Sequence, residues 1–282
     1  MSDHGLDPEC GAASDKRPGP GATEALVMYL VLVCYALFLG PVCIRAFGKA
    51  STIVFTAGFG LIPLLYTRAR GYDFRSVFSL RRPSGRQIGG GLLFAAGIFL
   101  LVYLASGIAA SLIPAMRRNS GRVDAGIAAM PFWLGIVEIV LLPAVFEELL
   151  FRGFIQSGLR RAAGRIWTVV LCGVLFGLMH GDLSRIPFTA ILGIALACAL
   201  RETSSLAVPV TMHAAHNLVL FLMIRASSAA RLADASGTGF EAALVLLLGL
   251  WILAGCILAR VGYCLLVSSE RTKSVSIEVE DI

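Results

Sequence analysis

The stretch Phe146-Glu-Glu-Leu-Leu-Phe-Arg-Gly-Phe154 places two glutamates, Glu147 and Glu148, and one arginine, Arg152, near the end of a long apolar run, 132–159. A charged side chain at the centre of a membrane helix costs about 2.5–3.5 kcal/mol on insertion scales, while each Leu or Phe returns only about 0.3–0.6 kcal/mol. Three such groups in one span therefore require polar partners, water or a chemical role. Ionisable residues inside a membrane segment are functional candidates by default.

The rest of the chain supports a membrane setting for this stretch. Of the 282 residues, 57% are hydrophobic, and the mean hydropathy is +0.81. This composition excludes a soluble globular domain. Runs of membrane-spanning length recur along the chain, and the second and sixth of them are short. The predicted fold is an all-α, polytopic transmembrane helical bundle with about eight spans, at 25–44, 51–66, 88–113, 132–159, 166–183, 187–200, 206–224 and 241–266.

The distribution of charge predicts how the chain lies in the membrane. The net charge of +6 does not require a nucleic-acid partner, because the basic residues lie between the apolar runs. If the N-terminus is assumed to lie inside, 114–131 and 225–240 become outer loops. The inner segments then hold 15 basic residues and the outer segments hold 8, with Arg260 in the last span left uncounted. The positive-inside rule then places both termini in the cytoplasm. We expect a multi-pass protein of the cell inner (cytoplasmic) membrane, with the lipid bilayer and no nucleic acid among its partners.

One membrane-embedded bundle, 25–267, is expected to carry the function, with its motif core at 137–222. Residues 1–24 are polar and rich in Gly, Pro and Asp, and they are predicted to form a disordered lead, while 268–282 form a polar tail. No internal repeat and no second domain is visible. The oligomeric state stays open, since Gly173-x-x-x-Gly177 fits helix packing between two subunits as well as packing within one bundle.

Within the central run, Glu148 and Arg152 are spaced i, i+4 with the acid first, the favourable orientation for an ion pair on one helix face. Glu147 is rotated by about 100° from Glu148. We therefore expect Glu148 to be held by Arg152. We expect Glu147 to face a cavity instead. Pro143, four residues before Glu147, removes a backbone hydrogen bond and is expected to bend the helix. Glu138 is expected on the side of the ion pair, with a lesser role.

Three of the four histidines lie within or at the edge of apolar spans: His180, His213 and His216. Phe176 and His180 share one face of the fifth span, and His213 and Asn217 share one face of the seventh. A single histidine in a helix is more often a packing residue than a catalyst. Two imidazoles in separate spans, with a carboxamide one turn away and a glutamate pair nearby, favour a functional site.

These groups suit one kind of chemistry. A carboxylate such as Glu147, together with His180, can polarise a water molecule for attack on an amide carbonyl. His213 and Asn217 can donate hydrogen bonds to the resulting oxyanion. At 1.5 Å of rise per residue, Glu147 and His180 lie at similar depths in the membrane, but His213 is shallower. Helix tilt or a cavity must bring His213 to the others. The pattern predicts amide hydrolysis without a covalent intermediate.

Several alternatives remain. His213 and His216 are separated by alanines and do not form an H-E-x-x-H motif, and no G-x-S-x-G elbow is present. A zinc site built from Glu147, His180 and His213 is compatible with the ligand types, although we expect no cofactor. A non-catalytic membrane protein of the same fold, acting in immunity or as a scaffold, is the main rival. A transporter or proton relay is weaker, because the inverted repeats of many transporters are missing.

Three motifs of the chain, in this order and in separate apolar spans, resemble those of the type II CAAX prenyl endopeptidases: Glu147-Glu148-x-x-x-Arg152, Phe176-x-x-x-His180 and His213-x-x-x-Asn217. These enzymes belong to the CPBP (or Abi) group of glutamate intramembrane proteases. The resemblance runs over about 137–222, and the first three spans and the last span add nothing to it.

The resemblance implies an α-helical membrane protease in which Glu147 and His180 activate water. It implies that His213 and Asn217 form the oxyanion hole, supported by the second glutamate and the arginine of the first motif. The expected partner is a peptide or protein substrate near or in the membrane. With three lysines against 21 arginines, the composition suggests a GC-rich bacterium. A peptide or a sorting tail is therefore expected rather than a prenylated substrate.

Overall fold

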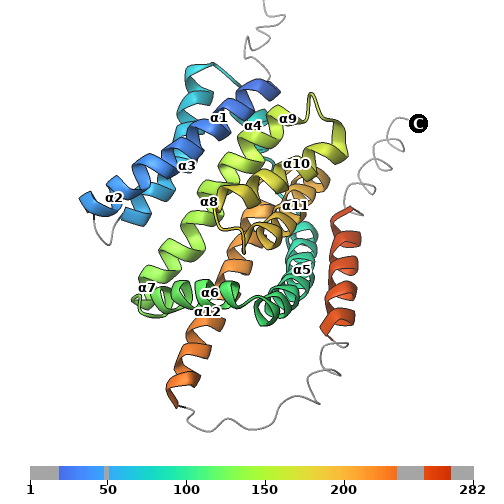
Figure 1. Ribbon diagram of the computed structural model, residues 1–282. Helices are drawn as coiled ribbons and strands as arrows, with labels where there is room; N and C mark the ends of the chain where they lie inside the picture. The colour runs from blue at the N-terminus through green and yellow to red at the C-terminus, as the bar shows by residue number, and fades with distance from the viewer. Residues whose placement is uncertain (1–18, 48–50, 234–250, 268–282) are drawn as a thin grey trace, which may run out of the picture.

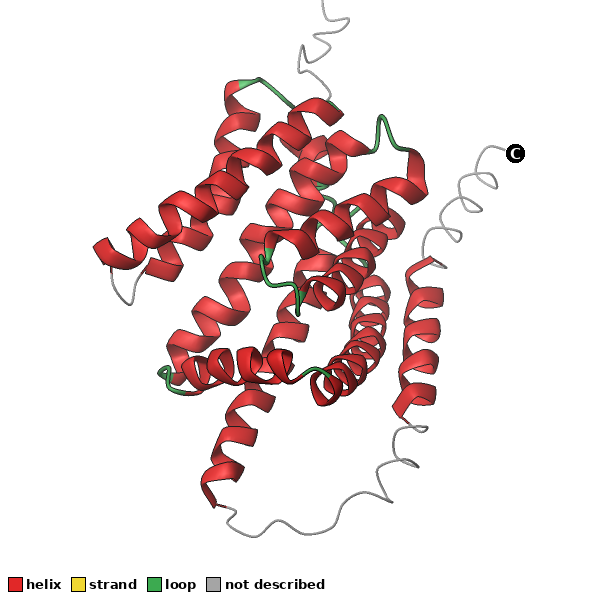
Figure 2. Ribbon diagram, viewed as in Figure 1, coloured by secondary structure: helices red, strands yellow, loops and turns green. Residues whose placement is uncertain are grey.

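The computed structural model describes residues 19–47, 51–233 and 251–267. Within these residues every regular element is a helix and no strand is present (Figures 1 and 2). Five of the described helices are long and apolar enough to cross a membrane, and two shorter apolar helices accompany them. The expected all-α membrane bundle is confirmed. The N-terminal lead, which is predicted to be disordered, and the polar C-terminal tail lie largely outside the described residues.

Each of the eight expected apolar runs corresponds to helical structure among the described residues. The short second and sixth runs are full helices, α3 and α11. The elements in chain order are α1 (Ala22–Cys34), η1 (Tyr35–Leu39), α2 (Gly40–Phe47), α3 (Ser51–Ala69), α4 (Phe74–Phe78), α5 (Gly85–Leu112), α6 (Pro114–Ala128), α7 (Phe132–Gly135), η3 (Ile136–Leu141), α8 (Leu142–Glu148), η4 (Leu149–Ile155), α9 (Gln156–Leu159), α10 (Gly164–Met179), α11 (Ile186–Thr203) and α12 (Ala207–Ala233), followed by the helix Trp251–Val267.

The central run, which carries the glutamate pair, is not a uniform α-helix. Two π-helical segments, η3 and η4, flank the single α-helical piece α8. The change from π to α geometry occurs at Leu142, one residue before Pro143. A proline removes a backbone donor, and π-helical turns are rare and occur frequently at functional sites. The expected bend of the helix at Pro143 stays a prediction.

Helix α1 begins at Ala22, before the start expected at residue 25. Glu24 explains the difference, because its carboxylate accepts a hydrogen bond from the Gly21 amide at 3.0 Å and caps the helix. The same carboxylate accepts the hydroxyl of Tyr72 at 2.7 Å and lies 3.4 Å from the Arg70 guanidinium. Distant polar groups thus fix the first turn, and this contribution is not visible in the local composition.

The outer loop expected at 114–131 is instead mostly the helix α6, which crosses α12 in Figure 1. Pro114 occupies the first turn, where its missing N–H has no cost. Arg225 of α12 donates to the carbonyl oxygens of Ala128 at 3.3 Å and Met130 at 2.8 Å, so it satisfies acceptors at the C-terminal end of α6. Helix α12 also continues into the second loop expected at 225–240, whose later part lies outside the described residues.

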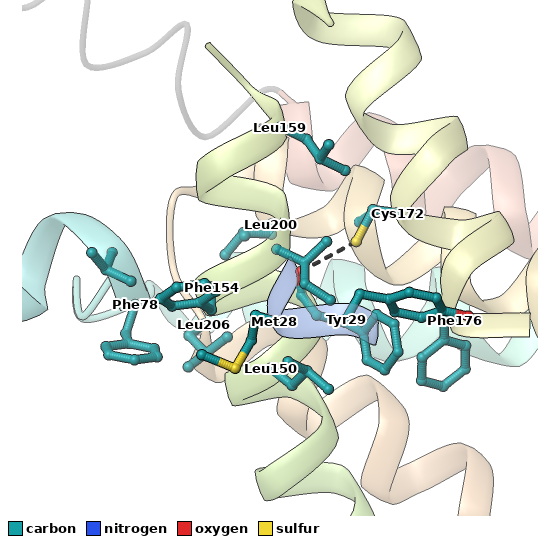
Figure 3. Packing of buried hydrophobic residues seen from close by; sticks show 14 of the residues in the cluster. Met28, Tyr29, Phe78, Leu150, Phe154, Leu159, Cys172, Phe176, Leu200 and Leu206 are labelled. Atoms are coloured by element: carbon teal, nitrogen blue, oxygen red, sulfur yellow. Dashed lines mark hydrogen bonds between the residues drawn. The ribbon is translucent and has the colours of Figure 1, made fainter. Parts of the chain in front are cut away.

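The main hydrophobic core packs around the second half of the central run. Figure 3 shows side chains from α1, α4, α10 and α11 meeting those of η4 and α9. Its labelled members are Met28, Tyr29, Phe78, Leu150, Phe154, Leu159, Cys172, Phe176, Leu200 and Leu206. The Cys172 thiol donates to the Phe151 carbonyl oxygen at 3.2 Å, which ties α10 to η4. The core therefore holds the glutamate-bearing helix firmly against α10.

Small residues bring α10 and α11 into backbone contact. A Cβ atom on Gly173 would lie 2.6 Å from the Ile194 nitrogen, and one on Gly177 would lie 2.7 Å from the Ile186 oxygen. Both positions therefore need glycine. The Gly173-x-x-x-Gly177 motif packs within one bundle, which was one of the two alternatives that the sequence allows.

The arginine-rich connections gather at one end of the bundle. Arg161 donates to the Gly19 carbonyl oxygen at 2.9 Å, so the α9–α10 connection meets the residues before α1. The α4–α5 connection meets the α11–α12 connection, where Leu80 pairs with Ser205, whose hydroxyl donates to the Arg81 carbonyl oxygen at 2.6 Å. All of these connections belong to the predicted inner side. The side of the membrane that this end faces stays a prediction.

Candidate active site

Glu148 is the centre of the polar network in the bundle. Its Oε1 atom accepts a hydrogen bond from Arg152 Nη1 at 3.0 Å and lies 2.9 Å from His213 Nδ1. The Glu148 and Arg152 side chains are both 0% exposed. The expected i, i+4 ion pair is therefore present and fully buried. Its link to His213 joins the central run to α12, which the spacing alone did not reveal.

Arg152 is fixed from two further directions. Its Nη2 atom donates to the Gly193 carbonyl oxygen of α11 at 2.8 Å. Its guanidinium carbon lies 4.6 Å from the centroid of the Phe176 ring, so the cation rests on an aromatic face of α10. One buried arginine thus holds together elements from three parts of the chain, and its charge is balanced by Glu148.

The contact with Glu148 orients the ring of His213. Because Nδ1 faces the Glu148 carboxylate at 2.9 Å, Nε2 is the ring nitrogen that remains for other partners.

His180 lies at the C-terminal end of α10 and has the same kind of orientation. Its Nδ1 atom lies 2.9 Å from the Phe176 carbonyl oxygen, which can only accept, so Nδ1 carries the proton and Nε2 offers a lone pair. The Phe176 ring lies edge-on to both imidazoles, with centroid distances of 5.0 Å to His180 and 5.8 Å to His213. Two histidines from separate helices therefore converge on one phenyl ring.

Asn217 lies one turn after His213 on α12, and its Nδ2 atom donates to the Ile139 carbonyl oxygen at 3.0 Å. Ile139 lies in the π-helical segment η3, so this hydrogen bond ties α12 to η3 and fixes the Asn217 side chain. The second hydrogen of its amide remains for another acceptor.

Glu147 is partly exposed, in contrast to the fully buried Glu148 beside it. The two carboxylates therefore differ in environment, as their rotation around the helix predicts. The residue before Glu147, Phe146, packs against Gly60 of α3, where an added Cβ would overlap the phenyl ring. The helix α3 therefore fixes the position of α8 directly beside Glu147.

Two residues near the site lie elsewhere than the sequence suggests. Glu138 was expected on the side of the ion pair, but it is 1% exposed and faces Thr52 of α3, without a well-formed hydrogen bond. The π-helical turns of η3 explain the error, because they change the rotation per residue that the prediction assumed. His216 packs edge-on against Phe99 of α5, with ring centroids 5.2 Å apart.

The loop after His180 is ordered by Asp182. Its carboxylate accepts hydrogen bonds from the amide and the hydroxyl of Ser184, at 2.9 and 2.6 Å, and lies 3.8 Å from Arg185 Nε. These interactions, the Ser184 hydroxyl first, hold the pKa of Asp182 below its usual value. Asp182 therefore stabilises the turn that directs the chain from His180 into α11.

Across the described ranges, no three His, Cys, Asp or Glu side chains lie close enough together to hold a metal ion. Glu147, His180 and His213, the zinc ligands considered above, do not form a preformed ligand set in this conformation. The two histidines instead use their Nδ1 atoms within the protein.

Comparison with known proteins finds similarity over the segment that carries this site. The family model described as type II CAAX prenyl endopeptidase Rce1-like matches residues 128–219, a segment that spans all six candidate positions. A protein of Bacillus subtilis (strain 168) named "Putative membrane peptidase YdiL" is 26% identical over 151 residues. Together with the long apolar helices, these similarities support a multi-pass membrane protein with a membrane protease fold.

The match to the Bacillus relative is partial. It covers 51% of this chain and 61% of the relative. No solved structure matches the chain.

Sequence reasoning found the three motifs, but it missed the carbonyl oxygens of Gly193 and Ile139, because backbone acceptors have no signature in a sequence.

Proposed function

We propose that this protein is a glutamate intramembrane endopeptidase that hydrolyses a peptide bond in a membrane-associated peptide or protein. The observation that carries the proposal is the convergence of His180 and His213 on the Phe176 ring, beside the buried Glu148–Arg152 pair. Histidines that served only for packing would not be expected to contact the same ring beside a buried ion pair. The family match adds to this support.

In the proposed reaction, Glu147 accepts a proton from a water molecule that is oriented by the lone pair of His180 Nε2. The water oxygen attacks the carbonyl carbon, and the carbonyl oxygen becomes negatively charged. His213 Nε2 and the second amide hydrogen of Asn217 donate to this oxyanion. The protonated Glu147 then gives its proton to the leaving amine as the carbon–nitrogen bond breaks.

In this scheme Glu148 and Arg152 are positioning residues. The 2.9 Å contact between Glu148 Oε1 and His213 Nδ1 holds the imidazole ring in place and leaves Nε2 to face the oxyanion. Arg152 neutralises Glu148 and joins it to α11. Donors that are already in position need little reorganisation when the negative charge develops. Removal of a single oxyanion donor lowers kcat by about 10²–10³-fold.

The test uses detergent-purified protein and a library of peptides. Glu147→Ala and His180→Ala are expected to abolish cleavage. The matched controls are Glu138→Gln, which changes a buried acid in the same helix run, and His216→Asn, which changes a histidine that packs against Phe99 of α5. Both controls are expected to retain cleavage. Cleavage by either of the first two variants would disprove the assigned mechanism.

Experiments on the same protein distinguish two alternatives, a zinc-dependent peptidase and a non-catalytic protein. Cleavage that is lost on treatment with a chelator and restored by zinc would favour the metal version. A non-catalytic immunity or scaffold role would leave a cellular phenotype intact in Glu147→Gln, while changes to the walls of the site would abolish it. We place the protein in the cell inner membrane with both termini in the cytoplasm, and a sorting tail or leader peptide is the expected substrate. Accessibility labelling of the arginine-rich end in intact cells tests this topology.

A further inference from the structure

A polar cavity of about 190 Å³ lies at the arginine-rich end of the bundle, between η4, α9, α10 and α11. One molecule of liquid water occupies about 30 Å³, so the cavity has room for a ligand several times larger. Four arginines line it: Arg152, Arg160, Arg165 and Arg201. No carboxylate is among the described residues that line it. A cavity with this lining attracts anions.

The charges around the cavity are only partly balanced. Arg152 is paired with Glu148, and Arg201 is paired with its neighbour Glu202. The exposed side chains of Arg160 and Arg165 have no ion pair or hydrogen bond within the described part of the chain. Two positive charges therefore face the cavity without a counter-charge.

Two buried polar groups at the same cavity lack partners. Arg152 is 0% exposed, and its Nε–H has no acceptor. Gln156, one turn later, is 5% exposed; its amide nitrogen donates to the Ala197 carbonyl oxygen at 2.9 Å, but its Oε1 atom has no donor. An unsatisfied buried polar atom costs about 1–3 kcal/mol. A ligand in the cavity that both accepts and donates would satisfy the two atoms together.

We propose that this cavity is a binding site for a phosphate group that carries or adjoins a hydroxyl. The phosphate oxygens would accept from Arg152 Nε and from the guanidinium groups of Arg160 and Arg165, which suit phosphate geometry. The hydroxyl would donate to Gln156 Oε1. The ligand chemistry is that of monohydrogen phosphate, and also of the glycerol-phosphate headgroup of an anionic lipid, since basic pockets between membrane helices bind such headgroups.

The site is coupled to the candidate active site through one side chain. Arg152 offers Nε to the cavity and Nη1 to Glu148, which in turn holds His213. A bound phosphate would compete with Glu148 for the positive charge of Arg152. It would thereby change the electrostatic environment of His213. Binding at the cavity is separate from the peptidase proposal and is measured without any substrate.

The test is the binding of two probes to the full-length protein in neutral detergent or in phosphatidylcholine nanodiscs. Inorganic phosphate is expected to raise the thermal unfolding midpoint more than chloride at equal ionic strength. Phosphatidylglycerol doped into the nanodiscs is expected to be enriched around the protein and retained in native mass spectrometry. An effect of phosphate would identify the free anion as a ligand, whereas retention of the lipid alone would identify the headgroup.

The Arg160→Gln/Arg165→Gln double variant is expected to weaken binding of the effective probe by at least about tenfold, which corresponds to about 1.4 kcal/mol. Both side chains are exposed and unpaired, so the fold is expected to persist. The matched control is Arg86→Gln, which removes an exposed charge from the first turn of α5 outside the cavity lining and should change binding less than twofold. Failure of both probes to bind, or equal losses in the double variant and the control, would overturn the proposal.

Discussion

The buried ion pair allows a quantitative prediction through a double-mutant cycle. The variants are Arg152→Met, Glu148→Gln and the combination of the two. Both wild-type side chains are 0% exposed and joined at 3.0 Å, so either single change leaves a charge buried without its partner. Removing one member of such a pair typically costs about 3–5 kcal/mol in the free energy of unfolding. Each single variant is expected to lose that amount.

The double variant is expected to lose less than the sum of the two single variants. It buries no charge, and the introduced glutamine side chain would still accept a hydrogen bond from the imidazole that Glu148 holds in the wild type. The Gly193 carbonyl oxygen loses its donor, at a cost of about 1–3 kcal/mol. Neighbours of this kind show coupling energies of about 0.5–3 kcal/mol, and we expect the upper part of that range because both groups are fully buried.

Unfolding by sodium dodecyl sulfate in mixed micelles, followed by circular dichroism, measures these free energies. The matched control is Arg70→Gln, which breaks an ion pair with Glu24 whose arginine is 46% exposed. This control is expected to cost under about 1 kcal/mol. Additivity of the two single variants within about 0.5 kcal/mol would refute the view that the Glu148–Arg152 pair is one buried electrostatic unit.

Further predictions concern the helix interface, the site and the loop. Gly173→Ala is expected to destabilise the protein by about 1–3 kcal/mol, because the new methyl group would meet the α11 backbone, while Val174→Ala on the exposed face is expected to change stability by less than about 0.5 kcal/mol; thermal unfolding compares them. Asn217→Ala is expected to lower kcat by about 10²–10³ with little change in KM. Because the pKa of Asp182 is lowered in the folded protein, its stabilising effect is present at neutral pH and disappears as the pH falls through that pKa. The difference in unfolding midpoint between wild type and Asp182→Asn should therefore vanish at low pH.

The prediction of helical segments succeeded because it depends on composition over long stretches. A run of about 20 apolar residues favours a membrane-spanning helix whatever its neighbours are. The ends of the elements were less predictable. Helix α1 begins at Ala22 because Glu24 meets Tyr72 and Arg70, and α6 is helical because Arg225 caps it. These contacts join residues far apart in the sequence, so no local pattern contains them.

The Glu148–Arg152 pair was predictable because it lies within one helix, where i, i+4 spacing fixes proximity. The partner of His213 was not, because it depends on how α12 packs against the central run. Glu138 shows the limit of helical arithmetic, since π-helical turns rotate it toward α3 and away from the ion pair.

The amino-acid sequence by itself determined that this chain folds as a helical membrane protein. It also indicated that a few ionisable residues carry its chemistry, because charge is costly to bury in lipid and is retained there mainly where it has a partner or a function. Only the tertiary structure decided which of these residues meet. His180 and His213 converge on Phe176, and Asn217 donates to the Ile139 carbonyl oxygen of the central run. Such contacts depend on the rotation and packing of separate helices, which are set by the whole core and not by any one segment.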